Sequence, residues 1–186
     1  MREVMLAKSA GFCYGVRRAV ELARRTAEGG GNCWMLGDLI HNRFVVEDLA
    51  RRGIRKTADS ALLGPDDTVI IRSHGELKSV LDALEQRGVR CVNATCPNVI
   101  RIQRLVAQAV IIGEAAHPEV AGIASWCLSP LVFDGPESVQ VWLDTPESKR
   151  EIPMTVVAQT TCIRELFESS WKIIKKECTN VKIFDT

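Results

Sequence analysis

The chain has 186 residues, of which 46% are hydrophobic and 25% are charged. This composition is typical of a globular protein and excludes an intrinsically disordered or low-complexity chain. The formal net charge is +1, and no run of basic residues is longer than a pair such as Arg17-Arg18 or Lys175-Lys176. Because duplex nucleic acid is bound through clustered positive charge, we expect no nucleic-acid partner, and any anionic ligand has to be small.

The sequence also argues against a membrane or secreted protein. No apolar stretch approaches the roughly 18 residues that a membrane helix needs. The N-terminus, Met1-Arg2-Glu3-Val4, lacks the charged-then-apolar layout of a signal peptide. We therefore expect a cytoplasmic protein with no membrane partner. Seven cysteines, an odd number in such a chain, argue against a disulfide framework and favour thiolate chemistry for some of them.

Short apolar runs alternate with amphipathic stretches along the whole chain, which predicts an α/β fold. Glycines at 29–31, 53 and 88 end three of the amphipathic stretches, as expected of helix C-termini. The predicted strands cover residues 33–36, 54–56, 68–72, 89–92, 110–112, 131–133, 155–158 and 181–184. The predicted helices cover residues 16–28, 43–52, 77–87, 97–109, 118–126 and 164–177, and one more begins at Pro136.

Two domains are expected, one covering residues 1–96 and the other residues 97–186. The boundary rests on the repeated spacing of the units, since Cys13 and Cys96 each stand just ahead of an amphipathic helix. One junction in the second domain is unusual. The helix that ends at Ala109 meets the strand that begins at Val110 with no Gly, Asn or Pro between them. We interpret this junction as a missing turn, which would leave the second domain strained or rebuilt there.

Cys13 and Cys96 are the best candidates for metal ligation or redox chemistry. A thiolate ahead of a helix is stabilised by the exposed amide hydrogens and by the positive end of the helix dipole. No pair of cysteines has the Cys-x-x-Cys spacing, so any metal site has to be assembled from distant segments. Ordinary packing as small hydrophobic side chains is expected for the other five, which are Cys33, Cys91, Cys127, Cys162 and Cys178.

The three histidines, His41, His74 and His117, all lie in loops beside predicted helix starts. Imidazole N–H groups together with free helical amides make a site for phosphate groups. A single loop histidine is more often plain surface, but three in the same context favour phosphate binding. Glu119 is either a first-turn carboxylate that the helix dipole favours or a proton donor. Thr160 directly follows a predicted strand, where α/β proteins place ligand contacts.

Six segments, taken in order, give the chain a resemblance to a known family. They are Ala10-Gly11-Phe12-Cys13-Tyr14-Gly15-Val16, Ile40-His41-Asn42, Arg72-Ser73-His74-Gly75, Ala94-Thr95-Cys96-Pro97, His117-Pro118-Glu119-Val120-x-Gly122 and Gln159-Thr160-Thr161. With these segments the chain resembles the 4-hydroxy-3-methylbut-2-enyl diphosphate reductases, the terminal enzymes of the non-mevalonate isoprenoid pathway. Each segment alone is a weak signal, but six in the family's order are specific.

The resemblance implies an iron-sulfur oxidoreductase in which three similar α/β domains form a trefoil around a 4Fe-4S cluster held by three cysteines. Carried over, Cys13 and Cys96 would be cluster ligands, and His41, His74 and His117 would contact the substrate diphosphate. Glu119 would deliver protons, and Thr160 would hydrogen-bond near the substrate hydroxyl. The third domain, with the third cluster cysteine, would be absent from this chain.

The activity that the resemblance implies is reductive removal of the allylic hydroxyl as water. The products would be isopentenyl and dimethylallyl diphosphate, with ferredoxin or flavodoxin as electron donor. Two alternatives remain open at this point. One is an inactive fragment that binds diphosphates or a partner chain without a cluster, and the other is a zinc-binding structural module. The zinc module is the less favoured, because the sequence has no closely spaced cysteine pair.

Overall fold

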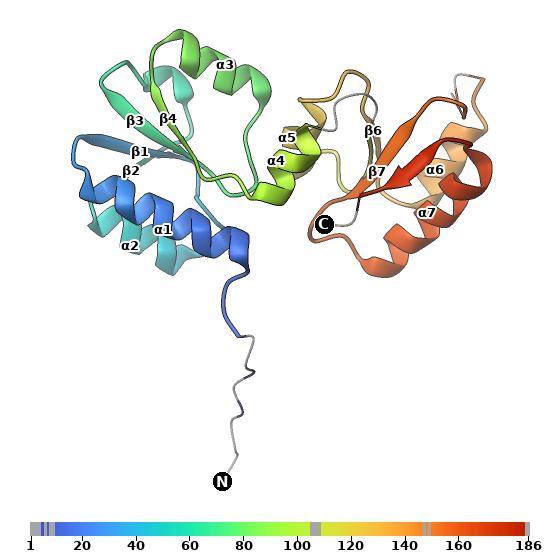
Figure 1. The fold of residues 1–186 in the computed structure, drawn as a ribbon, viewed down its shortest axis with the longest axis horizontal. Coiled ribbons are helices and arrows are strands. Elements are labelled where there is room, and N and C mark those ends of the chain that lie inside the picture. Colours follow the sequence, from blue (N-terminus) through green and yellow to red (C-terminus); the bar gives the residue numbers. More distant parts are fainter. Residues whose placement is uncertain are drawn as a thin grey trace.

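The computed structural model describes residues 5, 7, 10–104, 109–146, 148 and 150–184. Two α/β lobes lie side by side (Figure 1), and each is built on a four-stranded sheet. Every strand pairing in both sheets is parallel, which confirms the predicted α/β class. Within the described ranges, no helix combines the length and the apolar character needed to cross a bilayer.

The first sheet has the strand order β2-β1-β3-β4. Its strands are β1 (Asn32–Leu36), β2 (Arg55–Thr57), β3 (Asp67–Ile71) and β4 (Arg90–Asn93). The helices of this lobe are α1 (Tyr14–Glu28), α2 (Arg43–Arg51) and α3 (Lys78–Gln86), and a single 3-10 turn, η1, covers Ser60–Leu62.

Alternate residues of the central strands face opposite sides of the first sheet. Met35 and Ile70 pack in one core with side chains of α1 and α2, such as Ala19 and Leu49. Their neighbours along the strands, Leu36, Val69 and Ile71, pack with Leu84 of α3 in a second core. A parallel sheet covered by helices on both faces explains why these strands read as continuous apolar runs.

The second sheet repeats the strand order of the first, as β6-β5-β7-β8. Its strands are β5 (Ala109–Ile112), β6 (Leu131–Phe133), β7 (Met154–Ala158) and β8 (Val181–Ile183). One face is covered by α6 (Pro136–Leu143) and α7 (Arg164–Glu177), and the other by α4 (Pro97–Gln103) and α5 (Pro118–Ala124).

The junction between α4 and β5 differs from the sequence prediction. The helix ends at Gln103, and Ala109 is a buried strand residue that pairs with Thr155, so the predicted extension of the helix to Ala109 was wrong. Ala109 is apolar and small, a residue type that fits a helix pattern and a buried strand equally well. The predicted missing turn falls at residues 105–108, which lie outside the described residues.

The predicted histidines, Glu119 and Thr160 follow the two central strands of each sheet, whereas Cys13 precedes α1 and Cys96 follows the edge strand β4. In the order β2-β1-β3-β4 the chain reverses its direction of winding between β1 and β3, and in the second sheet it does so between β5 and β7. Such a switch point opens a crevice at the carboxyl ends of the strands, where α/β proteins bind ligands. His41 and His74 come after β1 and β3, and His117 and Thr160 come after β5 and β7.

Candidate active site

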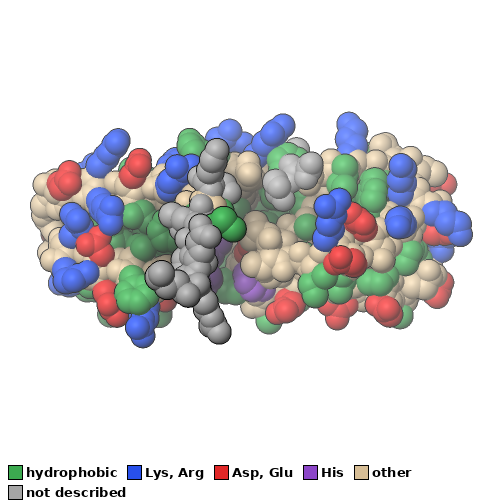
Figure 2. All heavy atoms as spheres, turned by 90° about the horizontal axis from the view of Figure 1, so that it is seen from below, with side chains coloured by type: hydrophobic (Ala, Val, Ile, Leu, Met, Phe, Trp, Pro, Cys, Tyr) green, Lys and Arg blue, Asp and Glu red, His purple; other side chains and the backbone are tan. Residues whose placement is uncertain are grey.

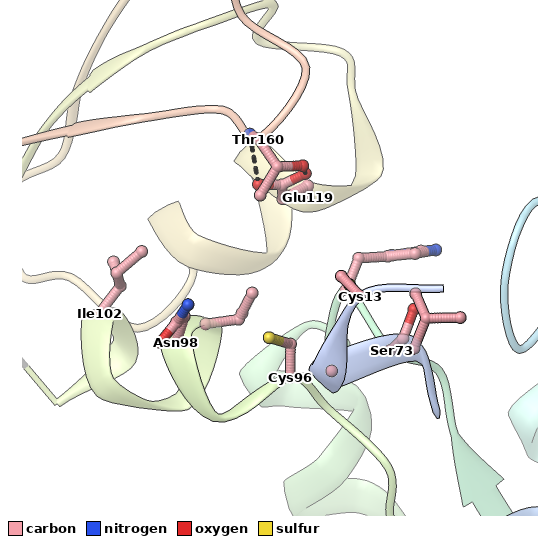
Figure 3. A pocket seen from close by; sticks show the side chains of 11 residues that line it. Cys13, Ser73, Cys96, Asn98, Ile102, Glu119 and Thr160 are labelled. Carbon is pink, nitrogen blue, oxygen red and sulfur yellow. Dashed lines mark hydrogen bonds between the residues drawn. The ribbon is translucent and has the colours of Figure 1, made fainter. Parts of the chain in front are cut away.

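A cavity of about 290 Å³ lies where the two lobes meet (Figure 3). Its lining includes Cys13, His74, Cys96, Glu119 and Thr160. In Figure 3, Glu119 and Thr160 lie across the opening from Cys13 and Cys96. Residues from both lobes therefore form one site, although they are up to 147 positions apart in the sequence, from 13 to 160.

Cys13 and Cys96 occupy equivalent positions, as predicted. Cys13 is the N-cap residue of α1 and Cys96 is the N-cap residue of α4. Neither side chain caps its own helix with a hydrogen bond. Cys13 is exposed and Cys96 is half-buried, so both thiols remain accessible from the cavity.

The other five cysteines do not line this cavity. Cys33 lies in β1 and Cys91 in β4, while Cys127, Cys162 and Cys178 pack at the hydrophobic cores of the second lobe. Burial raises the pKa of all five thiols above the ordinary value, which lowers their thiolate content at neutral pH. For Cys33, Cys127, Cys162 and Cys178 this environment favours the expected packing role. Cys91 is exposed on β4, so the packing prediction was wrong for that residue.

The donor chemistry of the cavity fits an iron-sulfur cluster in part. Cysteine thiolates are the ligands that hold such clusters, and two cysteine side chains line the cavity. Across the residues that the structure describes, no group of three or more His, Cys, Asp or Glu side chains is arranged to hold a metal ion. Two thiols of this chain, those of Cys13 and Cys96, therefore line the cavity.

The rings of His41 and His74 stack on each other, with centroids 5.2 Å apart and an angle of 7° between the planes. His74 lines the cavity, whereas His41 does not. Both ring nitrogens of His74 are buried and have no hydrogen-bond partner among the described residues. Burial, together with the nearby charges of Arg72, His41 and His117, lowers the pKa of His74 to about 4. At neutral pH, His74 is therefore an uncharged imidazole with free hydrogen-bonding capacity.

His117 is the N-cap residue of α5, and its Nδ1 accepts a hydrogen bond of 3.2 Å from the backbone N–H of Glu119. An Nδ1 that accepts leaves the ring proton on Nε2, which can donate to a ligand. Like His41, His117 is not among the residues that line the cavity. Histidine side chains lie near the middle of the molecule when it is seen from below (Figure 2).

Glu119 is only 3% exposed and accepts two hydrogen bonds from Thr160. The backbone N–H of Thr160 donates to Oε1 over 2.9 Å, and the Thr160 hydroxyl donates to Oε2 over 2.7 Å. Glu119 lies in the first turn of α5 and Thr160 follows β7, so this pair joins the two segments at the switch point of the second sheet. A buried carboxylate held at both oxygens has a fixed direction, as a proton-transfer group needs.

Comparisons with known proteins identify the family of the chain. Residues 4–186 match the family model described as LytB protein. The chain belongs to the LytB family. It is 33% identical to the 4-hydroxy-3-methylbut-2-enyl diphosphate reductase of Caldanaerobacter subterraneus, with 99% of this chain and 66% of that protein covered. It is 37% identical to the protein of the same name from Geobacter sulfurreducens, again with 99% and 66% covered. The chain therefore spans about two thirds of the length of these relatives.

Two solved structures resemble the chain over nearly its whole length. One is a structure of (E)-4-hydroxy-3-methyl-but-2-enyl diphosphate reductase, the terminal enzyme of the non-mevalonate pathway. It is 31% identical with a TM-score of 0.81, and 99% of this chain and 67% of that chain are covered. The other is the reductase of Plasmodium falciparum, with a TM-score of 0.83 over 95% of this chain and 57% of that one. At 20% identity, the second match supports the fold alone.

Some residues of the site were not predicted from the sequence. Ser73 and Asn98 line the cavity, and each lies next to a predicted residue, Ser73 before His74 and Asn98 in the first turn after Cys96. The sequence signal that could have identified them as cavity residues is a short polar side chain next to a predicted site residue. Gln159 has a structural role, because its Oε1 accepts from the N–H of Glu114 and its Nε2 donates to the Thr161 hydroxyl.

A buried ion pair behind His74 was also missed. Nη2 of Arg72 donates to Oε2 of Glu76 over 2.6 Å, and the side chain of Glu76 is only 6% exposed. The loop from Arg72 to Glu76 carries His74 between these two residues, so the ion pair closes the loop at its base. The sequence carries no such signal, because a glutamate four residues after an arginine is usually a solvent-exposed pair.

Proposed function

We propose that this protein acts as a 4-hydroxy-3-methylbut-2-enyl diphosphate reductase. The observation that carries the proposal is one cavity between the lobes, where two cysteines at helix N-cap positions, a half-buried uncharged histidine and the Glu119–Thr160 pair are brought together. A site for reductive dehydroxylation of an allylic diphosphate needs a source of electrons, a proton donor and donors for the diphosphate. The three groups supply these three needs.

Cys13 and Cys96 would hold the 4Fe-4S cluster, since thiolates at helix N-termini are stabilised by the helix dipole. The cluster would supply electrons to the allylic carbon. The electrons would come from a small redox protein such as ferredoxin or flavodoxin. Because this chain provides two thiolates to the cavity, we expect it to retain iron weakly.

His41, His74 and His117 would bind the diphosphate from three loops. Neither ring nitrogen of His74 has a partner, so the one that carries the proton of the neutral ring can donate to the diphosphate, and His117 presents its Nε2 proton. Charge-assisted contacts of this kind contribute about 1.5 to 3 kcal/mol each. A chain with net charge +1 can therefore bind a small dianion without a basic patch.

Glu119 would deliver the proton that lets the hydroxyl leave as water. In the overall reaction, two electrons and two protons convert the carbon–oxygen bond to a carbon–hydrogen bond and one water. Expulsion of hydroxide at neutral pH is unfavourable, so an acid has to protonate the oxygen as the bond breaks. The Thr160 hydroxyl, which donates to Glu119, would orient the carboxyl towards the substrate.

The proposal includes a cytoplasmic location and two domains, residues 1–96 and 97–186. The all-parallel sheets on either side of Cys96 support that division, since the strands of the first end at Asn93 and those of the second begin at Ala109. The alternative is an inactive fragment that binds diphosphates or a partner chain without a cluster.

Anaerobic reconstitution with iron and sulfide tests the proposal. We expect broad visible absorbance and an electron paramagnetic resonance signal after reduction, both lost in Cys13→Ser and in Cys96→Ser. Cys91→Ser is the matched control, because this residue is exposed and lies outside the cavity. Equal iron content in all four proteins would contradict the assignment of Cys13 and Cys96 as ligands. A colourless wild type that still binds inorganic diphosphate would support the cluster-free alternative.

A further inference from the structure

The thiol of Cys96 lies directly against the first turn of α1. A Cβ atom placed on Gly15 would be 2.6 Å from Sγ of Cys96 and 3.2 Å from its Cβ. Carbon atoms do not approach a sulfur that closely, so any side chain at this position would displace the thiol. Gly15 is buried and lies two residues after Cys13. The absence of a side chain at position 15 is therefore what lets the Cys96 thiol pack against the first turn of α1, the helix that begins directly after Cys13.

One turn further along the same helix, Arg18 holds the segment that leads into Cys96. Its Nη1 donates to the carbonyl of Thr95 over 3.1 Å, and its Nη2 donates to the carbonyl of Asn93 over 3.4 Å. On the other side, the N–H of Cys96 donates to the carbonyl of Ser73 over 2.7 Å. The turn that carries Cys96 is thus fixed from α1 and from the loop that carries His74.

We infer that Gly15 and Arg18 are positioning residues that place the Cys96 thiol beside Cys13. Both lie on α1, the helix that Cys13 caps, so one rigid element sets the position of both cysteines. Arg18 draws the turn of Cys96 onto α1, and Gly15 provides the space that the thiol occupies. This inference rests on the proposed function, because the two cysteines matter together only if they share a ligand.

The helix itself gives no reason for glycine at position 15. Glycine in an α-helix is less favourable than alanine. If only the stability of the helix mattered, Gly15→Ala would stabilise the protein or leave it unchanged. If Gly15 positions Cys96, the same substitution separates the two thiols. The two roles therefore predict different outcomes for one variant.

The test uses dibromobimane on the reduced chain without any metal. Each of its two bromomethyl arms alkylates one thiol, forming a carbon–sulfur bond with loss of bromide and a proton, and the product becomes fluorescent when both arms have reacted. Peptide mapping by mass spectrometry then measures the yield of the link between Cys13 and Cys96. Thermal unfolding of the unmodified chain is measured in parallel.

We expect the wild type to form this link, and Gly15→Ala to form it roughly tenfold less or worse, because a misplacement of about 1 Å strongly lowers intramolecular reactivity. Arg18→Met, which keeps the apolar stem and removes both hydrogen bonds, should also lower the yield. The unfolding temperature of Gly15→Ala should not fall. The controls are Gly29→Ala, where φ is −72°, and Arg25→Met on the exposed face of the same helix; both should behave as the wild type.

The proposed function and the positioning roles of Gly15 and Arg18 fail through different outcomes. A wild type that does not form the link would overturn the shared cysteine site and with it the proposed function. If the wild type, Gly15→Ala and Arg18→Met all form the link between Cys13 and Cys96 equally well, the positioning role of Gly15 and Arg18 is overturned and the proposed function is not. If Gly15→Ala lowers the unfolding temperature, Arg18→Met decides, and an unchanged yield in that variant would count against the inference.

Discussion

The imidazole rings of His41 and His74 lie parallel, with their centroids 5.2 Å apart. The two residues come from loops that follow neighbouring strands, β1 and β3, so the topology of the first sheet places them together. Two stacked imidazolium ions would repel each other, and the buried ring is the one whose pKa is lowered, to about 4. The stacked pair therefore favours a neutral His74 ring in the absence of a bound anion.

The first prediction concerns the titration of His74. Its pKa of about 4 lies below the unfolded value of 6.5, so between these two pH values the unfolded chain binds more protons than the native chain. The contribution of His74 to the free energy of unfolding is fully present above pH 6.5. It is lost as the pH falls towards 4, by up to about 3 kcal/mol in total. Nuclear magnetic resonance titration of the ring protons should show a midpoint near 4. A midpoint near 6.5 would contradict the burial of His74.

The second prediction concerns diphosphate binding by the three histidines. Replacement of His41, His74 or His117 by alanine should weaken the binding of inorganic diphosphate by roughly tenfold or more, since each charge-assisted contact contributes about 1.5 to 3 kcal/mol. Isothermal titration calorimetry measures the affinities. Unchanged affinity in all three variants would remove the histidines from the substrate site.

His117 needs an additional variant, because it also caps α5. His117→Ala removes both the ring and the cap, and loss of a cap destabilises a protein by about 0.5 to 2 kcal/mol. His117→Asn keeps an acceptor for the helix amides and removes the imidazole. We expect His117→Asn to retain stability and lose diphosphate affinity. An affinity equal to that of the wild type would show that capping is the whole role of His117.

The third prediction concerns the ion pair of Arg72 and Glu76. Glu76 is more deeply buried than Arg72, with side-chain exposures of 6% and 24%. Arg72→Met leaves the buried carboxylate of Glu76 without its ion-pair partner and should lower the free energy of unfolding by about 3 kcal/mol. Glu76→Met leaves the more exposed Arg72 unpaired and should lower the free energy of unfolding by less. The double variant should recover much of the loss. Urea unfolding measures all three, and additive losses in the double variant would show that the two side chains do not interact.

Much of the fold could be predicted from local patterns. Glycine-ended helices and apolar strands are local signals, and helix caps such as Cys13, Cys96 and His117 stand where the pattern begins. The end of α4 could not be found this way, because Ala109 suits a helix as well as the buried strand that it forms.

The arrangement of the site depends on contacts between distant segments, which the sequence alone does not reveal. The two hydrogen bonds from Thr160 to Glu119 join residues 41 positions apart, and Arg18 reaches carbonyls 75 and 77 positions away. The six motifs identified which residues matter. They did not indicate that Glu119 is held at both oxygens, or that Gly15 makes room for a thiol.

In the proposed reaction, Glu119 delivers a proton to a reacting allylic diphosphate. The most direct test is anaerobic turnover of 4-hydroxy-3-methylbut-2-enyl diphosphate by the cluster-loaded protein with a chemical reductant, comparing the wild type with Glu119→Gln. Thr160→Ser, which keeps the hydroxyl that donates to Glu119, is the matched control and should remain active.

Loss of the acid should lower turnover by on the order of 10²-fold to 10⁴-fold, while the cluster absorbance and the affinity for diphosphate are retained. A residue that serves only the helix dipole would instead change stability by up to about 1 kcal/mol. Near-normal turnover in Glu119→Gln would contradict the proposed mechanism.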